Sequence, residues 1–316
     1  MFRAGVSGRH VHELTIDAQD NIYGADISYV SEKWLSDVWK MTPAGTISYL
    51  LAPTTEPPRG MSNWLDRNGN MYLVDQNNHT KTKTVLLRRS PDGQVVILAG
   101  GAYGQQDGKG GAAKFSSVGG MAFGSDGSLY LSDGAAVRKV TIDGVVTTVA
   151  RELTSRTEDD KPALFGGSYR SLAGLSVDSS GTVYVADAGN RRLLRIKDGK
   201  TEVLFRSEPP YFPNGVVASP DGAIYVLEVG FTLPSAWSGP RVRKISADGS
   251  NRIIATAGFQ DAGSVKAAVA REAGVATEGF LSFFLVGNRI KYGATILGVT
   301  LLSTVAILWR RRKLRA

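Results

Sequence analysis

One ten-residue pattern recurs five times along the chain and constrains its fold more than any other feature. Each copy runs from a turn rich in Asp, Asn, Ser and Gly into a short apolar stretch and ends on a carboxylate. The copies are DAQDNIYGAD, DRNGNMYLVD, GSDGSLYLSD, DSSGTVYVAD and SPDGAIYVLE, and they share Tyr23, Tyr72, Tyr130, Tyr184 and Tyr225. These tyrosines are about 41 to 58 residues apart, a spacing typical of repeats that stack one small sheet on the next.

Each repeat is expected to form four short strands. The third repeat predicts them over Gly120–Gly124, Leu129–Ser132, Ala136–Ile142 and Val145–Ala150. Asp-Gly between β-rich runs signals a two-residue hairpin, because such a turn needs positive φ. One such sheet cannot bury both of its faces, whereas radial stacking can. The sequence therefore predicts an all-β chain, a β-propeller of four-stranded blades, with five blades legible and six possible. The turn pairs are Asn68-Gly69, Asp92-Gly93, Asp126-Gly127, Asp143-Gly144, Ser180-Gly181, Asp198-Gly199, Asp221-Gly222 and Asp248-Gly249.

Two segments resemble the NHL-repeat family of β-propellers. VADAGNRRLLRI, Val185–Ile196, is similar to the repeat signature, and the glycine-rich Ile97–Phe123 is similar to the linker between blades in bacterial members. The resemblance covers about residues 11–258. It implies a propeller, usually of six blades, but no particular activity, because such propellers carry unrelated functions. Either a first blade precedes this sequence, or the ring closes with five.

An uncharged apolar run, Tyr292–Trp309, predicts a transmembrane helix. It would span about 27 Å, close to the hydrocarbon thickness of a bilayer, with an aromatic ring at each end. The basic run RRRKLRA follows it directly and is expected on the cytoplasmic side. This organisation gives a propeller over residues 1–258, a stalk over 259–291, a transmembrane helix over 292–309 and a cytoplasmic tail over 310–316.

The orientation in the membrane has two possible explanations. An extracytoplasmic propeller requires an exported N-terminus, yet Met1–His10 has no apolar signal core. Either a signal segment lies upstream of this sequence, or the protein is tail-anchored with a cytosolic propeller. We expect the first, because a heavily basic tail resists translocation.

Composition argues against several kinds of site. Five of the eight net positive charges lie in the tail, at Arg310, Arg311, Arg312, Lys313 and Arg315, so no basic stripe remains for a nucleic acid. The absence of cysteine excludes disulfides, thiolate metal sites and cysteine nucleophiles. The chain has three histidines, so at most a single His is expected in a site, with carboxylates and amides as its partners.

The long connections are expected to lie on one face of the propeller, which would be its binding face. The face collects aromatic side chains, which provide contact area at a low entropic cost. The alternative is that these rings hold the long loops onto the propeller. The loops are Ile27–Asp37, Gln76–Lys83, Gly101–Ser117, Arg151–Arg170, Ser207–Phe212 and Gly230–Gly239, and the rings are Trp34, Tyr103, Tyr211, Phe212, Phe231 and Trp237.

The residues ten and eleven positions before each shared tyrosine should begin the inner strands and line the mouth of the channel. Of these, His12, Glu13 and Asn214 carry strongly polar side chains and are the candidates for a small polar site; ordinary strand-end residues are the alternative. The positions are His12-Glu13, Met61-Ser62, Gly119-Gly120, Ala173-Gly174 and Asn214-Gly215.

The segment PNGVVASPDGAIYVLE, Pro213–Glu228, is similar to part of the gluconolactonase and regucalcin family, six-bladed propellers that are divalent-metal hydrolases. The resemblance implies that Glu13 and Asn214 are metal ligands. It departs at the family's other Asn, whose position falls on Met61-Ser62 or on Gly119, and at the family's Asp, which should follow Asn214 in a later blade that is not legible here. A hard cation needs several oxygen ligands. Two functions therefore remain: binding of a protein, peptide or glycan without catalysis, which we favour, and metal-dependent hydrolysis of a lactone or similar ester.

The carboxylate that ends each repeat recurs so regularly that a structural role is expected, in which it accepts hydrogen bonds from backbone N–H groups of the adjoining loop. A basic residue recurs in each third strand and is expected to be structural as well. The carboxylates are Asp26, Asp75, Asp133, Asp187 and Glu228, and the basic residues are Lys40, Arg88, Lys139, Arg195 and Lys244.

Overall fold

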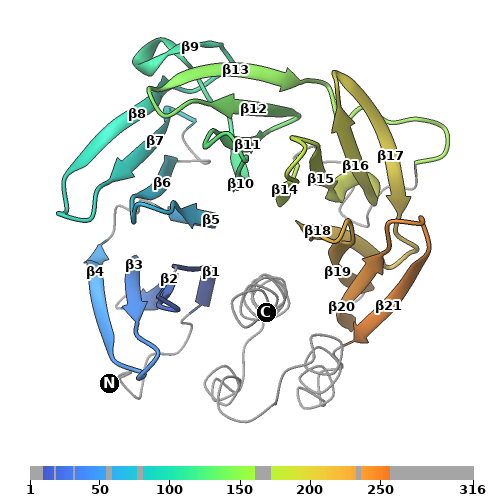
Figure 1. Ribbon diagram of the computed structural model, residues 1–316, viewed down its shortest axis with the longest axis horizontal. Coiled ribbons are helices and arrows are strands. Elements are labelled where there is room, and N and C mark those ends of the chain that lie inside the picture. The colour runs from blue at the N-terminus through green and yellow to red at the C-terminus, as the bar shows by residue number, and fades with distance from the viewer. Residues whose placement is uncertain are drawn as a thin grey trace.

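A computed structural model shows five four-stranded antiparallel sheets arranged radially, each with its first strand innermost (Figure 1). The structure describes residues 10–17, 19–30, 33–54, 59–76, 81–160, 172–232 and 236–256. The four main strands of each sheet follow the order of the sequence, so each set of four is a simple meander. The expected all-β propeller is confirmed, with five blades in the part of the chain that is described.

The strand bounds are as follows. Blade 1 comprises β1 (His10–Ile16), β2 (Ile22–Val30), β3 (Lys33–Met41) and β4 (Ile47–Thr54). Blade 2 comprises β5 (Arg59–Leu65), β6 (Met71–Gln76), β7 (Lys83–Arg89) and β8 (Val95–Ala102). Blade 3 comprises β10 (Val118–Phe123), β11 (Leu129–Asp133), β12 (Ala136–Val140) and β13 (Val145–Ala150). Blade 4 comprises β14 (Leu175–Val177), β15 (Val183–Asp187), β16 (Arg192–Lys197) and β17 (Lys200–Arg206). Blade 5 comprises β18 (Tyr211–Ala218), β19 (Ile224–Thr232), β20 (Ala236–Ile245) and β21 (Asn251–Thr256).

The glycine-rich linker between blades 2 and 3 adds a short fifth strand to blade 3. In it, β9 (Gly108–Lys109) pairs with the outer strand β13, and the 3-10 helix η1 (Gly110–Ala112) follows. A second 3-10 helix, η2 (Ala188–Asn190), follows β15 in blade 4. The linker thus covers the outer edge of blade 3, which would otherwise present unpaired backbone groups.

All eight turn glycines that the sequence singled out have positive φ, from 73° to 93°. Most of these turns are not the two-residue type that was expected. At Gly144, the N–H donates to the Thr141 carbonyl oxygen at 2.9 Å, and only the glycine has positive φ. This is a type I turn closed by a left-handed glycine. Asp198-Gly199 is of the two-residue type, because both residues have positive φ and Lys197 pairs with Lys200.

The shared tyrosine and the basic residue of the third strand lie directly opposite each other in every blade. In blade 1, the Lys40 ammonium lies 5.5 Å from the centre of the Tyr23 ring. The Tyr23 hydroxyl donates to Asp17 at 2.9 Å, and Asp17 also accepts from the backbone N–H of Asn21. The repeat therefore encodes a structural unit that ties the second strand to the third strand and to the preceding turn.

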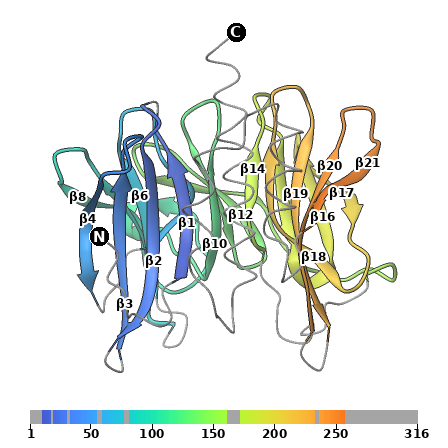
Figure 2. The same ribbon diagram turned by 90° about the horizontal axis from the view of Figure 1, so that it is seen from below.

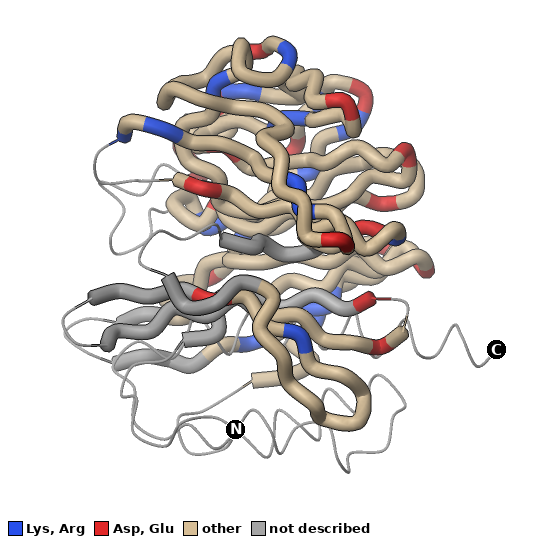
Figure 3. Tube along the Cα trace, turned by 90° about the vertical axis from the view of Figure 1, so that its left-hand side faces the viewer, with Lys and Arg blue, Asp and Glu red and all other residues tan. Residues whose placement is uncertain are grey.

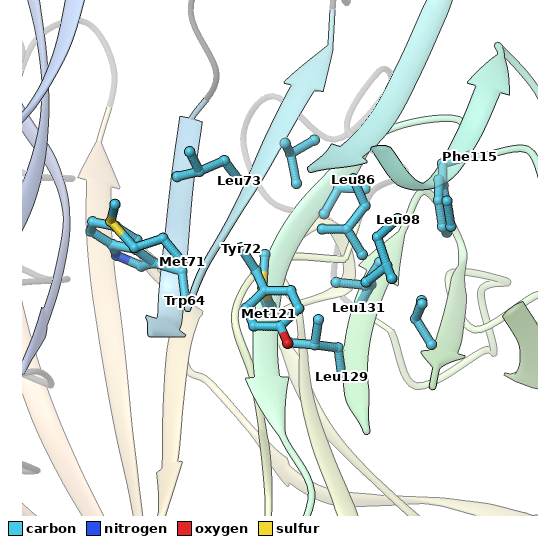
Figure 4. Packing of buried hydrophobic residues seen from close by; sticks show 14 of the residues in the cluster. Trp64, Met71, Tyr72, Leu73, Leu86, Leu98, Phe115, Met121, Leu129 and Leu131 are labelled. Atoms are coloured by element: carbon cyan, nitrogen blue, oxygen red, sulfur yellow. The ribbon is translucent and has the colours of Figure 1, made fainter. Parts of the chain in front are cut away.

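The core lies between neighbouring blades. Tyr23 of blade 1 packs edge-on against Trp64 of blade 2, with ring centroids 6.3 Å apart. Tyr72 of blade 2 meets Phe123 of blade 3 in the same way at 5.3 Å. Figure 4 shows the part of this core that includes Trp64, Met71, Tyr72, Met121 and Leu131. The shared tyrosines of blades 1 to 4 thus face the blade that follows.

Two connections that were expected to be loops are β-hairpins. Ile27–Asp37 and Gly230–Gly239 belong largely to the β2–β3 and β19–β20 pairs. The reason is that these segments continue the β-rich composition of their strands, with Tyr29 opposite Trp34 and Phe231 opposite Trp237. The two hairpins extend from blades 1 and 5 on the same side of the propeller (Figure 2).

The expected transmembrane segment, Tyr292–Trp309, lies outside the described residues, as do the stalk and the basic tail. Among the residues that are described, no helix is long and apolar enough to cross a membrane.

Candidate binding face and buried charge clusters

The mouth of the channel is built from a β-bulge that recurs in the first strand of three blades. The strand registers skip His12 in blade 1, Gly119 in blade 3 and Asn214 in blade 5. These are the first residues of the pairs that the sequence assigned to the mouth. A bulge re-aims the side chain of its extra residue and ends regular pairing, so these positions differ from ordinary strand ends.

In blades 3 and 4, close packing of the backbone demands glycine at the mouth. A Cβ on Gly119 would lie 2.4 Å from the Leu172 carbonyl oxygen, and one on Gly174 would lie 3.0 Å from the Asn214 carbonyl oxygen. The Gly174 N–H also donates to that Asn214 oxygen at 2.9 Å. The first strands of blades 3, 4 and 5 therefore touch through their backbones.

Among the mouth positions whose side chains are described, Asn214 is the one with a polar side chain. It is half-buried, and its amide has no hydrogen-bond partner among the described residues. The backbones of His12 and Glu13 lie in β1, at and after the bulge of blade 1, and their side chains are outside the description. The structure therefore places His12 and Asn214 at equivalent bulges of blades 1 and 5, with Glu13 directly after the bulge of blade 1.

Of the six aromatic residues expected on the binding face, three have described side chains. The Arg241 guanidinium stacks on Tyr211, 3.6 Å from the ring centre. Phe212 packs against Leu227 and Val229. The Lys81 ammonium lies 5.9 Å from the ring centre of Tyr103. Tyr211 and Phe212 thus fit the alternative in which the rings hold the polypeptide onto the propeller.

The other three aromatics are placed by their backbones. Trp34 lies in β3, and Phe231 and Trp237 face each other across β19 and β20. All three belong to the extended hairpins of blades 1 and 5.

Within the described ranges, no group of three or more His, Asp or Glu side chains could hold a metal ion. The side chain of Glu13, one of the two ligands that the resemblance implies, is not among those described.

Asp133 confirms the structural role expected for the recurrent carboxylates. Its Oδ1 accepts hydrogen bonds from the backbone N–H groups of Ser116 at 2.7 Å and Ser117 at 2.9 Å. Its Oδ2 accepts from Arg138 Nη1 at 2.9 Å. The carboxylate therefore anchors the end of the glycine-rich linker to blade 3.

Arg138 occupies the centre of this cluster and is almost fully buried. Its Nη2 donates to Asp107 Oδ1 at 2.8 Å and to the Gln106 carbonyl oxygen at 2.9 Å. Its guanidinium also lies 5.6 Å from the ring centre of Phe115. Burial opposes the ionised form of Asp107, but hydrogen bonds from Thr148 and the charge of Arg138 hold its pKa below the usual value.

A second buried cluster joins blade 4 to the connection that precedes it. Arg192 donates from Nε to Asp187 at 2.8 Å and from Nη1 to Asp160 at 2.6 Å. Asp160 also pairs with Arg206. Burial raises the pKa of Asp187 and outweighs the opposing effects of Asn190 and Arg192. Its Oδ1 is buried and has no hydrogen-bond partner among the described residues, which is consistent with that direction.

Glu228 forms the third cluster, in blade 5. It accepts hydrogen bonds from Arg241 Nε at 2.9 Å and from Arg243 Nε at 3.0 Å. Arg243 in turn lies over the ring of Phe205 in blade 4. Of the remaining carboxylates, Asp75 forms a partly exposed pair with Lys83, and the side chain of Asp26 is not described.

The arginines of these clusters were not predicted, although in two blades they follow the carboxylate at a fixed spacing. Arg138 follows Asp133 by five residues, and Arg192 follows Asp187 by five residues. This five-residue spacing is not found in blade 5, where the extended hairpin lies between the two residues and Arg241 follows Glu228 by 13 residues. Figure 3 shows Lys and Arg interspersed with Asp and Glu over the described part of the chain in that view.

No family model matches this sequence, and no curated protein matches it either. Solved structures do match. A gluconolactonase from Xanthomonas campestris superposes with a TM-score of 0.51 at 17% identity, covering 78% of this chain and 76% of that one. A virginiamycin B lyase from Staphylococcus aureus gives 0.47 at 11% identity, covering 77% and 83%. A calcium-binding regucalcin from Agrobacterium tumefaciens gives 0.42 at 14% identity, covering 70% and 85%. The chain is thus a β-propeller that shares its fold with the gluconolactonase.

Proposed function

We propose that this propeller is a non-catalytic binding module that presents the face carrying the extended hairpins of blades 1 and 5. The two hairpins bring Trp34, Phe231 and Trp237 to one side of a rigid scaffold. Aromatic residues on a rigid scaffold are well suited to bind a protein, peptide or glycan. The anchor expected over residues 292–309 would hold such a module at a membrane surface.

The proposal rests mainly on the structural role of the buried carboxylates in blades 3 to 5. Asp133, Asp187 and Glu228 are fully buried, and each is paired with an arginine. A general acid or base must be able to reach a substrate, and these groups instead join parts of the scaffold. At the mouth, blades 3 and 4 offer glycine and alanine rather than reactive side chains.

Peptide and glycan arrays probed with the full-length protein test the proposal. Binding is expected to be lost in Trp237→Ala and Trp34→Ala and retained in Tyr49→Ala, a residue of the outer strand β4 that is 53% exposed. Binding that survives both tryptophan substitutions would contradict the assignment to this face. So would binding that is lost equally in Tyr49→Ala.

A metal-dependent hydrolase of lactones or similar esters is the second candidate. It is favoured by the half-buried amide of Asn214 in its bulge, which has no hydrogen-bond partner among the described residues, and by the position of Glu13 directly after the equivalent bulge of blade 1. The fold shared with a gluconolactonase is compatible with it but does not establish an activity. Metal binding and lactone opening distinguish the two candidates.

A further inference from the structure

The extended hairpin of blade 5 begins where the sheet narrows from four strands to two. On one side, β18 begins at Tyr211, which pairs with Gly230 of β19. On the other side, β21 ends at Thr256, which pairs with Arg241 of β20. Beyond these residues, β19 and β20 pair with each other and with no further described strand. A hairpin of two strands is marginally stable on its own, so its direction depends on how its base is held.

The ladder between β19 and β20 is weak at this level. Gly230 lies opposite Gly239, and the register shifts between Gly230 and Phe231. Pro240 comes directly after Gly239 and has no N–H group for a ladder hydrogen bond. Glycines within a strand also weaken it, because they keep more conformational freedom. The hairpin therefore needs a further contact to fix its direction.

Arg241 provides such a contact across three strands. From β20, its guanidinium donates to the carboxylate of Glu228 in β19, from Nε at 2.9 Å and from Nη2 at 3.1 Å. The guanidinium also lies over the ring of Tyr211 in β18, 3.6 Å from the ring centre. Gly230, the partner of Tyr211 in β19, has no side chain to obstruct this contact. We call Glu228, Arg241 and Tyr211 the clamp.

The clamp is buried and is tied to blade 4. Glu228 is 0% exposed and Arg241 is 7% exposed, so salt screens their attraction only weakly. Two parallel hydrogen bonds between a guanidinium and a carboxylate fix the orientation of the two groups as well as their distance. Arg191 of blade 4 donates from Nη1 to the carbonyl oxygen of Tyr211. The base of the hairpin is therefore held against a neighbouring blade.

A second arginine binds the same carboxylate but is placed differently. Arg243 donates from Nε to Glu228 at 3.0 Å. Its guanidinium lies over the ring of Phe205 in blade 4 and donates from Nη1 to Asn251 of β21 at 2.8 Å. Arg243 thus holds the body of blade 5 to blade 4, whereas Arg241 contacts β18 at the level where the hairpin begins.

We propose that Arg241 is a positioning residue of the binding face: held between Glu228 and Tyr211, it sets the direction in which the hairpin of blade 5 projects. The inference rests on the proposed function, because this hairpin carries Phe231 and Trp237. It adds that the presentation of these two residues is controlled by a buried arginine at the base of the hairpin.

Hydrogen exchange of the full-length protein, followed by mass spectrometry, measures the hairpin without a ligand. Arg241→Met should accelerate exchange of the amides at 229–232 and 236–239 by about tenfold or more, relative to amides of β7. Arg241→Lys should give the same result, because an ammonium group keeps the charge but cannot form two parallel hydrogen bonds or lie flat on a ring. A role for the charge alone predicts instead that lysine restores the original rate.

The matched control is Arg243→Met, which also removes one of the two arginines bound to Glu228. It should leave exchange of the hairpin amides within about twofold of the original and accelerate exchange in β21. Tyr211→Leu removes the stacked ring and leaves every ion pair of the cluster in place. It should accelerate hairpin exchange as well, and it tests the clamp even where Arg241→Met folds poorly.

Equal acceleration of the hairpin amides in Arg241→Met and Arg243→Met would mean that both arginines only stabilise blade 5, which would overturn the proposal. Unchanged hairpin exchange in Tyr211→Leu, or full recovery in Arg241→Lys, would overturn it too. Failure of the binding function is distinguishable, because the arrays would then give no ligand while exchange still follows the clamp. With an array ligand, Arg241→Met should weaken binding by about tenfold, and an unchanged affinity would reject the positioning role.

Discussion

Arg138 donates a hydrogen bond from Nη1 to Oδ2 of Asp133 at 2.9 Å, and the two side chains are 1% and 0% exposed. The pair lies on the face of blade 3 that is turned towards blade 2, next to the glycine-rich linker. Asp187 with Arg192 and Glu228 with Arg241 repeat the relationship in blades 4 and 5. Each of these blades therefore combines an apolar core with a buried ion pair.

Asp133→Ala should destabilise the protein strongly, because it leaves Arg138 buried beside a single half-exposed carboxylate, that of Asp107. Breaking a buried pair by removing one partner costs about 3–5 kcal/mol. Denaturant unfolding of the two proteins measures the difference. The control is Asp143→Ala, which removes the exposed pair with Lys109 and should cost less than about 1 kcal/mol. Similar losses in the two variants would contradict the role of the buried cluster.

Gly119→Ala should destabilise blade 3, because the added Cβ would lie 2.4 Å from the Leu172 carbonyl oxygen. Overpacking of this kind typically costs about 1–3 kcal/mol. Gly111→Ala is the control, since a Cβ there has nothing within 4 Å and the residue does not have positive φ. Melting temperatures compare the two. A tolerated Gly119→Ala would mean that the inner strands are packed less closely than the structure indicates.

Tyr72 gives a pH dependence whose sign follows from its environment. Burial, together with the charge and hydrogen bond of Asp66, raises the pKa of Tyr72 to about 12. The folded state therefore keeps a proton that the unfolded state loses near pH 10, so the stability contributed by this group is present below pH 10 and lost between about 10 and 12. Ultraviolet difference titration should show a tyrosine ionising near pH 12 that is absent in Tyr72→Phe. Identical curves would refute the assignment.

Much of the fold could be predicted from the sequence, because its signals are local. The turn glycines need positive φ, and alternation around each shared tyrosine gives the strands and the face that is buried. The extended hairpins were missed because segments such as Ile27–Asp37 interrupt their apolar pattern with Ser, Lys and Glu. Pairing across the hairpin, with Tyr29 opposite Trp34, determines their structure instead.

The candidate site was less predictable, because its chemistry depends on contacts between distant residues. The carboxylate positions are periodic, but the strand register of the arginine partner differs between blades. Arg192 lies directly opposite Asp187, whereas Arg138 lies two residues beyond the one opposite Asp133. The partners Asp107 and Asp160 come from connections between blades, where the repeat gives no register.

Asn214→Ala should leave the free energy of unfolding within about 0.5 kcal/mol of the original, because the amide has no partner among the described residues. Urea unfolding checks this. A loss larger than about 1 kcal/mol would assign Asn214 a structural role. The substitution could then no longer be used to test for binding at the mouth of the channel.

The central claim, that the propeller binds rather than catalyses, is tested most directly by titrating the purified protein with Ca²⁺, Zn²⁺ and Mn²⁺. The melting temperature and lactone opening are followed together. A metal bound only by the native state would add about 2.7 kcal/mol of stability at a hundredfold excess over Kd. We predict no such shift and no turnover. A large shift that disappears in Asn214→Ala and Glu13→Ala, accompanied by metal-dependent lactone opening, would contradict the claim and establish the hydrolase.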